Sequence, residues 1–575
     1  MNDLLQTIEA HFRALAAQVL GVTAEQVDPR LKASARAEFG DLQLDGAMAL
    51  AKPLGKKPRE LAEALRPGMA EMAELAKVDV AGPGFLNLTL EAGALGAAMP
   101  AQLLDARLGV FPAEAPRKVV LDYASPNLAK EMHIGHLRST ILGDAIGRVL
   151  EARGHAVVRQ NHVGDWGTQF GMLLEHLIDT GWSADDGGGI ADLNTLYQEA
   201  KKRDDADKDF AQRARQRVVA LQSGDAEARK VWRSLIDESV AHMERVFDRL
   251  GVELRHEHLC PESFYNDRLA GVAGDLESAG VAVISDGALC AFVEGREHPL
   301  IVRKGDGGFG YGATDLAAVR YRAQDLGADR LVYVVDSRQK DHFEKFFDVA
   351  RRAGWAAEGV SLEHVGFGTI LGKDNRPFKT REGGTVRLTD VLDEAVKRAG
   401  EAALAKGQDT SGAERQDIAE AVGLGAVKYA DLSNDRIKDY VFDWDRMLAL
   451  EGNTAPYLLY SYARIRSIFR KGEVDYAGHA PVAVSLDDPA ERALGVHLIQ
   501  FGQAVASVDA SLEPHRLCNY LYELAVRFHR FFERCPVLKA KSDALRQSRL
   551  TLAKLTAEVL HRGLSLLGIR TLERM

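Results

Sequence analysis

Met132-His133-Ile134-Gly135-His136-Leu137-Arg138 stands between a hydrophobic segment, residues 119–123, and a segment with apolar residues at helical spacing, residues 141–150. The first has the pattern of a buried strand, and the second predicts an amphipathic helix. His133 and His136 are three residues apart, so they share one face at the start of that helix. The stretch therefore predicts a strand–turn–helix unit with two imidazoles at the helix N-terminus.

A helix N-terminus of this kind suits a phosphate group. Its free backbone N–H groups and its dipole favour an anion, Gly135 leaves room for close approach, and the two histidines can donate hydrogen bonds. The alternative is a pair of surface histidines, because short motifs also match by chance. The rest of the chain has to decide between these interpretations.

Composition limits the class of protein. The chain has 575 residues, 46% hydrophobic and 27% charged, so we expect about three or four domains with their own cores. It has no run of about 18 apolar residues and no basic leader, so we expect a soluble, cytoplasmic protein with no membrane partner. The 4 cysteines form no Cys-x-x-Cys pair, so we expect buried thiols and no tightly bound metal ion. A net charge of -10 argues only mildly against a nucleic-acid partner, because local basic clusters matter more.

The chain divides into four regions. Residues 1–112 predict a small α+β domain that ends at a linker, residues 111–116. From residue 117 to 395 strands alternate with helices, which predicts an α/β domain with a parallel sheet. Residues 396–453 predict a helical connector, and residues 454–575 an all-α bundle.

An insertion interrupts the α/β domain at roughly residues 183–298. A glycine-rich break at 185–189 precedes a charged helical pattern at 199–232, which we expect to be solvent-exposed. Strand-like runs follow at 281–284 and 300–303, and then two βα units with strands at 331–335 and 363–367. Because the insertion splits the sheet, ligands are expected at the carboxyl ends of strands that are distant in sequence.

A cationic loop follows the last of these strands, residues 372–386 (GKDNRPFKTREGGTV). Lys373, Lys379 and Arg381 could surround a triphosphate, because buried cations need an anion and the glycines at the ends allow the loop to close. A solvated surface loop is the alternative.

Two long strings, residues 124–140 (ASPNLAKEMHIGHLRST) and 161–171 (NHVGDWGTQFG), are similar to the arginyl-tRNA synthetases of class I. Residues 311–318 (YGATDLAA), the cationic loop and the C-terminal Glu573-Arg574-Met575 also fit this family, so the resemblance spans the chain. It implies a class I Rossmann-like catalytic core with an inserted domain. It also implies an N-terminal domain that contacts the tRNA elbow and a C-terminal anticodon-binding bundle.

The resemblance also implies the reaction. In this family the carboxylate of L-arginine attacks the α-phosphate of ATP, and arginyl then passes to the 3′-terminal adenosine of tRNA(Arg). His133, Gly135 and His136 are implied to contact ATP, with Mg²⁺ accompanying the phosphates. Catalysis is then positioning plus stabilisation of phosphate charge. Arginyl enzymes usually need tRNA for the first step and are commonly monomers.

The second class I signature, commonly Lys-Met-Ser-Lys-Ser, is replaced here by Pro377-Phe378-Lys379-Thr380-Arg381. Family members with a degenerate loop resemble this chain in carrying a lysine just ahead of the first signature, here Lys130. The resemblance implies that Lys130 and Arg381 are catalytic and that Lys379 and Arg381 bind ATP. Which of these cations meets the leaving pyrophosphate stays open.

The guanidinium of arginine needs carboxylate and neutral acceptors in a fixed geometry. Tyr311 and Asp315 are four residues apart, so on a helix they face the same way. Asp315 can accept a bidentate pair, and Tyr311 can accept a hydrogen bond or stack on the plane. A helix cap with a packed aromatic is the alternative. By resemblance the arginine pocket also includes Ser125, Asn127, His136, Asn161 and Gln339.

Residues 456–471 interleave aromatic and basic side chains, a mixture that stacks unpaired bases and neutralises phosphates. Core packing explains some of the aromatics, and the resemblance places anticodon recognition here. The candidate tRNA contacts are Tyr457, Tyr460, Arg464, Arg466 and Arg470.

Two other interpretations stay open. A synthetase for another amino acid, such as cysteine or glutamate, would share the ATP site, but the 311–315 segment and the lack of a cysteine-rich zinc site count against it. A tRNA-binding relative without catalysis is disfavoured because His133, His136, Asn161, Asp165 and Asp315 are all present.

Overall fold

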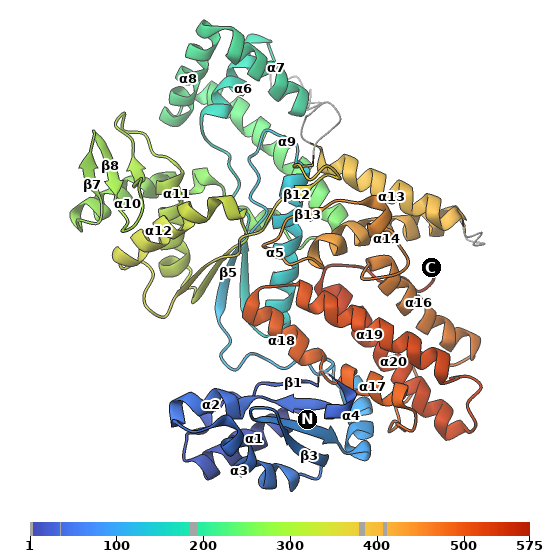
Figure 1. Cartoon of the computed structure of the whole chain (residues 1–575). Helices are drawn as coiled ribbons and strands as arrows, with labels where there is room; N and C mark the ends of the chain where they lie inside the picture. Colours follow the sequence, from blue (N-terminus) through green and yellow to red (C-terminus); the bar gives the residue numbers. More distant parts are fainter. Residues whose placement is uncertain (1–3, 35, 183–192, 379–385, 406–410) are drawn as a thin grey trace.

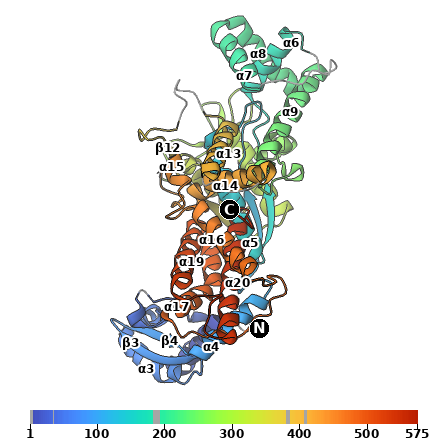
Figure 2. The ribbon, with the colours of Figure 1, turned by 90° about the vertical axis from the view of Figure 1, so that its right-hand side faces the viewer.

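The computed structural model describes residues 4–34, 36–182, 193–378, 386–405 and 411–575. Figure 1 shows a small N-terminal module at the bottom, a central sheet, a group of helices above the sheet and a helical C-terminal part beside it. The turned view in Figure 2 shows that together these parts form an elongated molecule. No helix within the described ranges is long and apolar enough to cross a lipid bilayer.

The N-terminal module is an antiparallel sheet covered by helices, in the strand order β1-β2-β4-β3. Leu5, Ile8 and Phe12 are buried on one side of its first helix, which confirms the helical spacing of these residues. The elements are α1 (Leu4–Leu20), β1 (Leu31–Ala33), β2 (Leu42–Leu44), α2 (Gly46–Leu54), α3 (Pro58–Ala70), β3 (Leu75–Ala81), β4 (Phe85–Leu90) and α4 (Ala92–Leu104).

The central sheet has four parallel strands in the order β11-β10-β5-β6. The chain adds β6 on one side of β5 and later adds β10 and β11 on the other, so the direction of winding reverses between β5 and β10. Ligands bind outside the carboxyl ends of the strands at such a reversal. The strands are β5 (Lys118–Asp122), β6 (Ala156–Gln160), β10 (Arg330–Tyr333) and β11 (Ser361–His364). The predicted parallel sheet, split by an insertion, is confirmed.

The two faces of this sheet pack on different helices. Val119 and Leu121 belong to an apolar cluster with α5 (Ile134–Ala152). Val120 belongs instead to a cluster with α11 (Tyr311–Arg320) and α12 (Lys340–Arg352). Both faces are therefore covered, and this explains why the strand sequence is continuously apolar.

The charged helical segment at 199–232 has a buried apolar side. Phe210, Leu221 and Val231 are buried where the helices pack together, while most of the described residues of the segment are exposed or half-buried, in line with the expected solvent-exposed segment. Charged side chains pair across the helices, as Arg213 and Glu175 do at 2.8 Å. The helices that pack together here are α6 (Thr168–Asp179), which precedes the predicted insertion, and α7 (Leu193–Ala206), α8 (Lys208–Ser223) and α9 (Ala226–Leu250) within it.

The strand-like runs at 281–284 and 300–303 do not join the central sheet. They form a separate antiparallel sheet in which Cys290 pairs with both Val283 and Ile301. Periodicity predicts a strand but not its partners, because pairing is a long-range choice. The elements are α10 (Asn266–Ser278), β7 (Val283–Ser285), β8 (Ala288–Ala291) and β9 (Leu300–Arg303).

The rest of the chain is almost wholly helical, as predicted. Short strands β12 and β13 pair where the chain leaves the central sheet. A bundle follows in which α19 buries Leu521, Leu524 and Phe528 on one face. The elements are β12 (Ile370–Leu371), α13 (Leu388–Ala405), α14 (Gly412–Leu432), β13 (Tyr440–Val441), α15 (Trp444–Met447), α16 (Ala455–Lys471), α17 (Pro489–Leu498), α18 (Phe501–Ser511), α19 (His515–Arg534) and α20 (Asp543–Leu566).

The N-terminal module docks on this bundle. Both views place α4 against α17 and α20, at the end of the bundle farthest from the insertion. Arg492 donates hydrogen bonds to the two carboxylate oxygens of Asp41 at 3.2 and 2.6 Å and to the Leu90 carbonyl at 2.7 Å. Asp41 of the N-terminal module therefore joins two domains.

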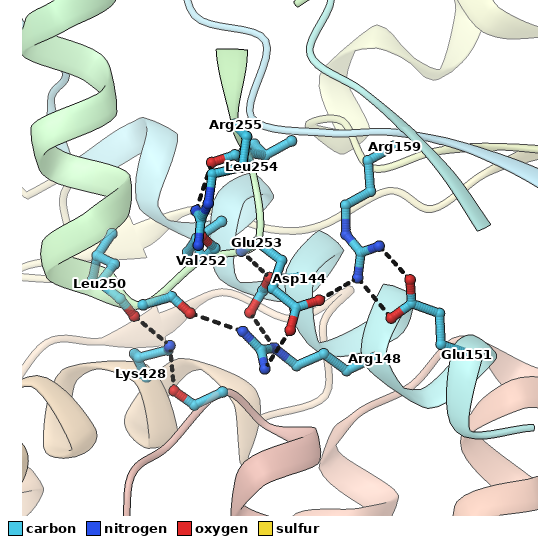
Figure 3. Close-up of polar contacts among 12 residues, drawn as sticks. Asp144, Arg148, Glu151, Arg159, Leu250, Val252, Glu253, Leu254, Arg255 and Lys428 are labelled. Carbon is cyan, nitrogen blue, oxygen red and sulfur yellow. Dashed lines mark hydrogen bonds and ion pairs between the residues drawn. The ribbon is translucent and has the colours of Figure 1, made fainter. Parts of the chain in front are cut away.

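Three other parts of the chain meet at the middle of α5 (Figure 3). Asp144 accepts the Glu253 N–H at 2.8 Å, just after α9 ends. Lys428 of α14 is 2% exposed and donates to the carbonyls of Leu250 at 2.7 Å and Gly568 at 2.5 Å. The insertion, the connector and the C-terminal tail thus meet beside the helix that begins with His133 and His136.

Candidate active site

The loop between β5 and α5 is strained. Ala124, Ser125 and Ala129 have φ angles of 68°, 41° and 67°, in the left-handed region that is costly for residues other than glycine. Buried hydrogen bonds hold this backbone: the Ala124 N–H donates to Ser139 Oγ at 2.9 Å, and the Ala129 N–H donates to Ser239 Oγ at 3.0 Å. Strain held in this way is common at functional sites.

His133 and His136 begin α5 with their rings stacked, the centroids 3.9 Å apart. Nδ1 of His133 accepts the Gly135 N–H at 3.0 Å, and Nδ1 of His136 accepts the His133 N–H at 3.1 Å. A Cβ at Gly135 would lie 2.8 Å from His133 Cε1, so the folded-back ring requires glycine there. Because both Nδ1 atoms accept, this bonding assigns the proton of each neutral ring to Nε2, which is then a donor.

Both rings are neutral near pH 7. Burial lowers the pKa of His136 to about 3, with smaller contributions from His133 and Lys130. Burial, and then the charge of Lys130, also lowers the pKa of His133. The two rings can therefore donate two N–H hydrogen bonds to an anion although neither ring carries a positive charge.

A cavity of about 470 Å³ opens beside these rings, between the carboxyl ends of β5 and β10. This volume is in the range of small-molecule sites. The residues predicted from the sequence that line it are Ser125, Asn127, His133, Gly135, His136 and Gln339. The lining that the sequence did not predict includes Arg138, Asp336, Arg338, Phe367 and Phe378.

Asn161 supports the cavity wall from behind. Its side chain is buried, and its Oδ1 accepts the Ser125 N–H at 3.0 Å. The Ser125 hydroxyl is engaged too, because it donates to Asp122 at 2.8 Å and accepts the His162 N–H at 3.1 Å. Asn161 is not among the residues that line the cavity.

Asp315 and Tyr311 lie on the first turns of α11 and meet His342 of α12. The Asp315 carboxylate lies 2.5 Å from His342 Nε2, and the Tyr311 ring centroid lies 4.8 Å from that of His342. The Tyr311 side chain is 69% exposed, which leaves it available to a ligand. Gln339, which lines the cavity, lies three residues before His342 at the start of α12.

Glu262 adds a further carboxyl group that the sequence analysis missed. Burial, followed by the charges of Asp165 and Asp315, raises the pKa of Glu262 to about 7. Asp165 is itself held by Ser263, whose N–H and hydroxyl donate to it at 2.9 and 2.5 Å. Mutual repulsion among buried and half-buried carboxyls marks a place where a cation would be stabilised. Glu262 begins a short 3₁₀ helix, Glu262–Tyr265, and no local sequence pattern identifies it.

The predicted phosphate-binding cations divide into three cases. Lys130 lies ahead of the histidines, with Nζ 4.0 Å from the centroid of the Tyr197 ring. Lys373 pairs with Asp443 at 3.2 Å and with Asp445 at 3.6 Å. In this structure its side chain therefore contacts these carboxylates and not the cavity. Lys379 and Arg381 lie outside the described residues.

A second cavity, of about 760 Å³, lies in the C-terminal bundle. Arg464 packs there against two rings, 5.6 Å from the centroid of Tyr460 and 4.6 Å from that of Phe532. Basic and aromatic side chains in one hollow suit unpaired bases and phosphates. The lining includes the predicted Tyr460, Arg464 and Arg470, and also Lys471, Phe532, Lys539, Arg574 and Met575.

The other two predicted tRNA contacts are engaged inside the protein. Arg466 pairs with Glu573 at 2.9 Å and lies 3.5 Å from the Tyr476 ring centroid. The Tyr457 ring centroid lies 5.3 Å from that of His529. In this structure both residues help to shape the surface of the bundle.

Three family models match the chain. Residues 98–444 match the catalytic domain of class I tRNA synthetases (R), residues 458–575 match the DALR anticodon binding domain, and residues 4–90 match the arginyl tRNA synthetase N-terminal domain.

Whole proteins match over the full length as well. The chain is 49% identical to an arginine–tRNA ligase of Shewanella amazonensis, covering 100% of both, and 50% identical to one of Stutzerimonas stutzeri, covering 96% and 97%. Among solved structures, arginyl-tRNA synthetases from Plasmodium falciparum and Thermus thermophilus superpose with a TM-score of 0.83 each, at 28% and 26% identity, covering 99% or more of each chain. The chain belongs to the arginyl-tRNA synthetase family of class I, whose members are arginine–tRNA ligases.

Proposed function

We propose that this arginine–tRNA ligase activates L-arginine with ATP in the cavity beside His133 and His136, and then transfers arginyl to the 3′-terminal adenosine of tRNA(Arg). One observation supports this most directly: two histidine donors follow β5, and a group of carboxyls around Asp165 follows the neighbouring β6, so both groups lie at the carboxyl edge of one sheet. The first can receive phosphate, and the second can receive a guanidinium.

ATP would bind with its phosphates at the start of α5. His133 and His136 would donate from Nε2 to phosphate oxygens, and the free N–H groups of the helix, with Gly135 close by, would add to the attraction. Lys130, Lys379 and Arg381 would supply positive charge. Mg²⁺ would arrive with ATP and take most of its ligands from phosphate and water.

The arginine carboxylate would form a new bond to the α-phosphorus as the bond to pyrophosphate breaks. No protein nucleophile takes part, so the rate depends on alignment and on stabilising the charge that develops on phosphate. In the second step, the ribose hydroxyl of the terminal adenosine would attack the arginyl carbonyl, and AMP would leave.

The side chain of arginine would be recognised by carboxylates. Asp315, oriented by His342, and Glu262 would accept its N–H groups, and Tyr311 would cover the guanidinium plane. Gln339, Asn127 and Ser125 line the cavity where the α-amino and carboxylate ends would lie, with Asn161 supporting the wall.

The tRNA would be held at the C-terminal cavity as well. Tyr460, Arg464 and Arg470 would contact anticodon bases and phosphates, while Tyr457 and Arg466 keep the surface in shape. Contacts with several phosphates would make binding weaken steeply with salt. The monomeric state and cytoplasmic location stay predictions.

One assay tests this function. ATP–pyrophosphate exchange is measured with each amino acid, with and without tRNA, and charging is followed with labelled arginine. Exchange and charging with arginine in the presence of tRNA are expected. Exchange with another amino acid and not with arginine would overturn the proposal, and binding of tRNA with no exchange at all would indicate a non-catalytic protein.

A further inference from the structure

Tyr197 of the insertion contacts the cation that precedes the signature histidines. The Lys130 ammonium lies 4.0 Å from the centroid of the Tyr197 ring, a cation–π geometry. Tyr197 lies on α7, so this contact joins residues from two separate parts of the chain. Both side chains are half-buried, so water weakens the interaction less than it would on an open surface.

The insertion also holds the backbone next to Lys130. Ala129 has a φ of 67°, and its N–H donates to the buried Ser239 Oγ on α9 at 3.0 Å. The insertion therefore fixes the strained residue before Lys130 through α9 and the Lys130 side chain through α7. Figure 1 shows these helices above the carboxyl edge of the sheet, where the cavity lies.

The charge of Lys130 reaches the catalytic histidines, because it contributes to lowering the pKa of both His133 and His136. A lysine side chain has four rotatable bonds, so its ammonium has a defined position only when something holds it. Of the contacts described for the Lys130 side chain, the Tyr197 ring is the one that can do this, and it leaves the N–H groups of the ammonium able to bond to phosphate oxygen.

We propose that Tyr197 is a positioning residue for adenylate formation, which holds the Lys130 ammonium beside His133 and His136 through the face of its ring. This rests on the proposed role of Lys130 as a cation for the phosphates. The insertion would then act on the chemistry of the catalytic domain through one aromatic side chain.

The test uses the full-length enzyme in ATP–pyrophosphate exchange with arginine and tRNA. Tyr197→Leu keeps apolar bulk and removes the ring, and a fall in kcat of about two- to thirty-fold is expected, with the KM for arginine unchanged. Tyr197→Phe keeps the ring face and should retain most of the rate. Thermal unfolding of each variant shows whether the fold is kept.

Two further proteins separate positioning from packing. In Lys130→Ala, which itself should be slower by about 10²-fold, the added Tyr197→Leu should have no further effect. Phe210→Leu loosens the insertion at a buried ring that does not touch Lys130, and it should leave the rate unchanged.

The outcomes distinguish the two claims. A normal rate in Lys130→Ala would overturn the role of Lys130 and this inference with it. A slow Lys130→Ala beside an unchanged or faster Tyr197→Leu would overturn only the inference. The inference alone would also be overturned if adding Tyr197→Leu to Lys130→Ala lowered the rate further. It would likewise be overturned if Phe210→Leu lost as much rate as Tyr197→Leu.

Discussion

Nδ1 of His133 accepts the backbone N–H of Gly135 at 3.0 Å, and this bond decides which ring nitrogen can act on a ligand. With Nδ1 engaged and the ring neutral, Nε2 carries the proton. His136 repeats the arrangement with the His133 N–H. The first helical turn thus assigns the tautomer of both imidazoles before any substrate arrives.

His133→Ala should lower the rate of ATP–pyrophosphate exchange by about 10²- to 10³-fold, because a transition-state donor is lost. The amide nitrogen of glutamine can reach about as far as Nε2 and donate in its place, so His133→Gln should keep clearly more activity than His133→Ala. His256, which is exposed, provides the control as His256→Gln. Equal losses in His133→Gln and His133→Ala would contradict donation from Nε2.

Glu262 should make arginine binding depend on pH. Its pKa is raised to about 7 in the free protein, mainly by burial, so about half of it is protonated near neutral pH. A guanidinium favours the ionised form, so affinity for arginine should rise with pH through 7, and binding near pH 7 should release a proton. Below pH 7 the dissociation constant should grow about tenfold for each pH unit.

Calorimetric titration with arginine in buffers of different ionisation enthalpy measures that proton release. Glu262→Gln should abolish the release and weaken binding, whereas Glu257→Gln at a nearby exposed carboxylate should change neither. Release that persists in Glu262→Gln would assign the proton to another group.

Asp315→Ala should weaken arginine binding by about 10²-fold or more, because one partner of a charge-assisted pair is removed. ATP binding should survive, since Asp315 is not among the residues that line the cavity beside the histidines. Discrimination against lysine should also fall, because an ammonium cannot use the bidentate geometry. Asp341→Asn, which removes an exposed carboxylate of α12, is the control. A normal arginine KM in Asp315→Ala would show that this assignment is wrong.

Local patterns predicted the parts of the site that lie on regular elements. The alternation of strands and helices predicted the sheet, and the spacing of His133 and His136 predicted their common place at a helix N-terminus, where both line one cavity. Gln339, which lines the same cavity, was implied by the family resemblance. The hydrophobic period is a local property of the chain, and it therefore survives in the folded state.

What the sequence did not show depends on long-range contacts. Glu262 acquires its raised pKa because folding buries it and, to a smaller extent, because folding brings it near Asp165 and Asp315. Tyr197 of the insertion reaches Lys130 only in the folded chain. The ion pair of Lys373 could not be predicted for the same reason, because its partner Asp443 lies 70 residues further on. Charge predicts that a side chain needs a partner but not which partner it finds.

Lys428 gives a prediction about stability. It is buried, and burial lowers its pKa to about 8 from the ordinary value of 10.5. Between those pH values the unfolded chain binds a proton that the folded protein has lost, so the free energy of unfolding rises with pH across this window. The neutral amine keeps two N–H donors, which match its two partners, the carbonyls of Leu250 and Gly568.

Relative to Lys428→Met, the wild-type protein should gain at most about 3 kcal/mol in its free energy of unfolding between pH 7 and pH 11. Thermal unfolding of both proteins at a series of pH values measures the gain, with Lys438→Met at an exposed lysine as the control. A difference in unfolding midpoint between wild type and Lys428→Met that stays constant over the series would mean that Lys428 keeps its proton in the folded state.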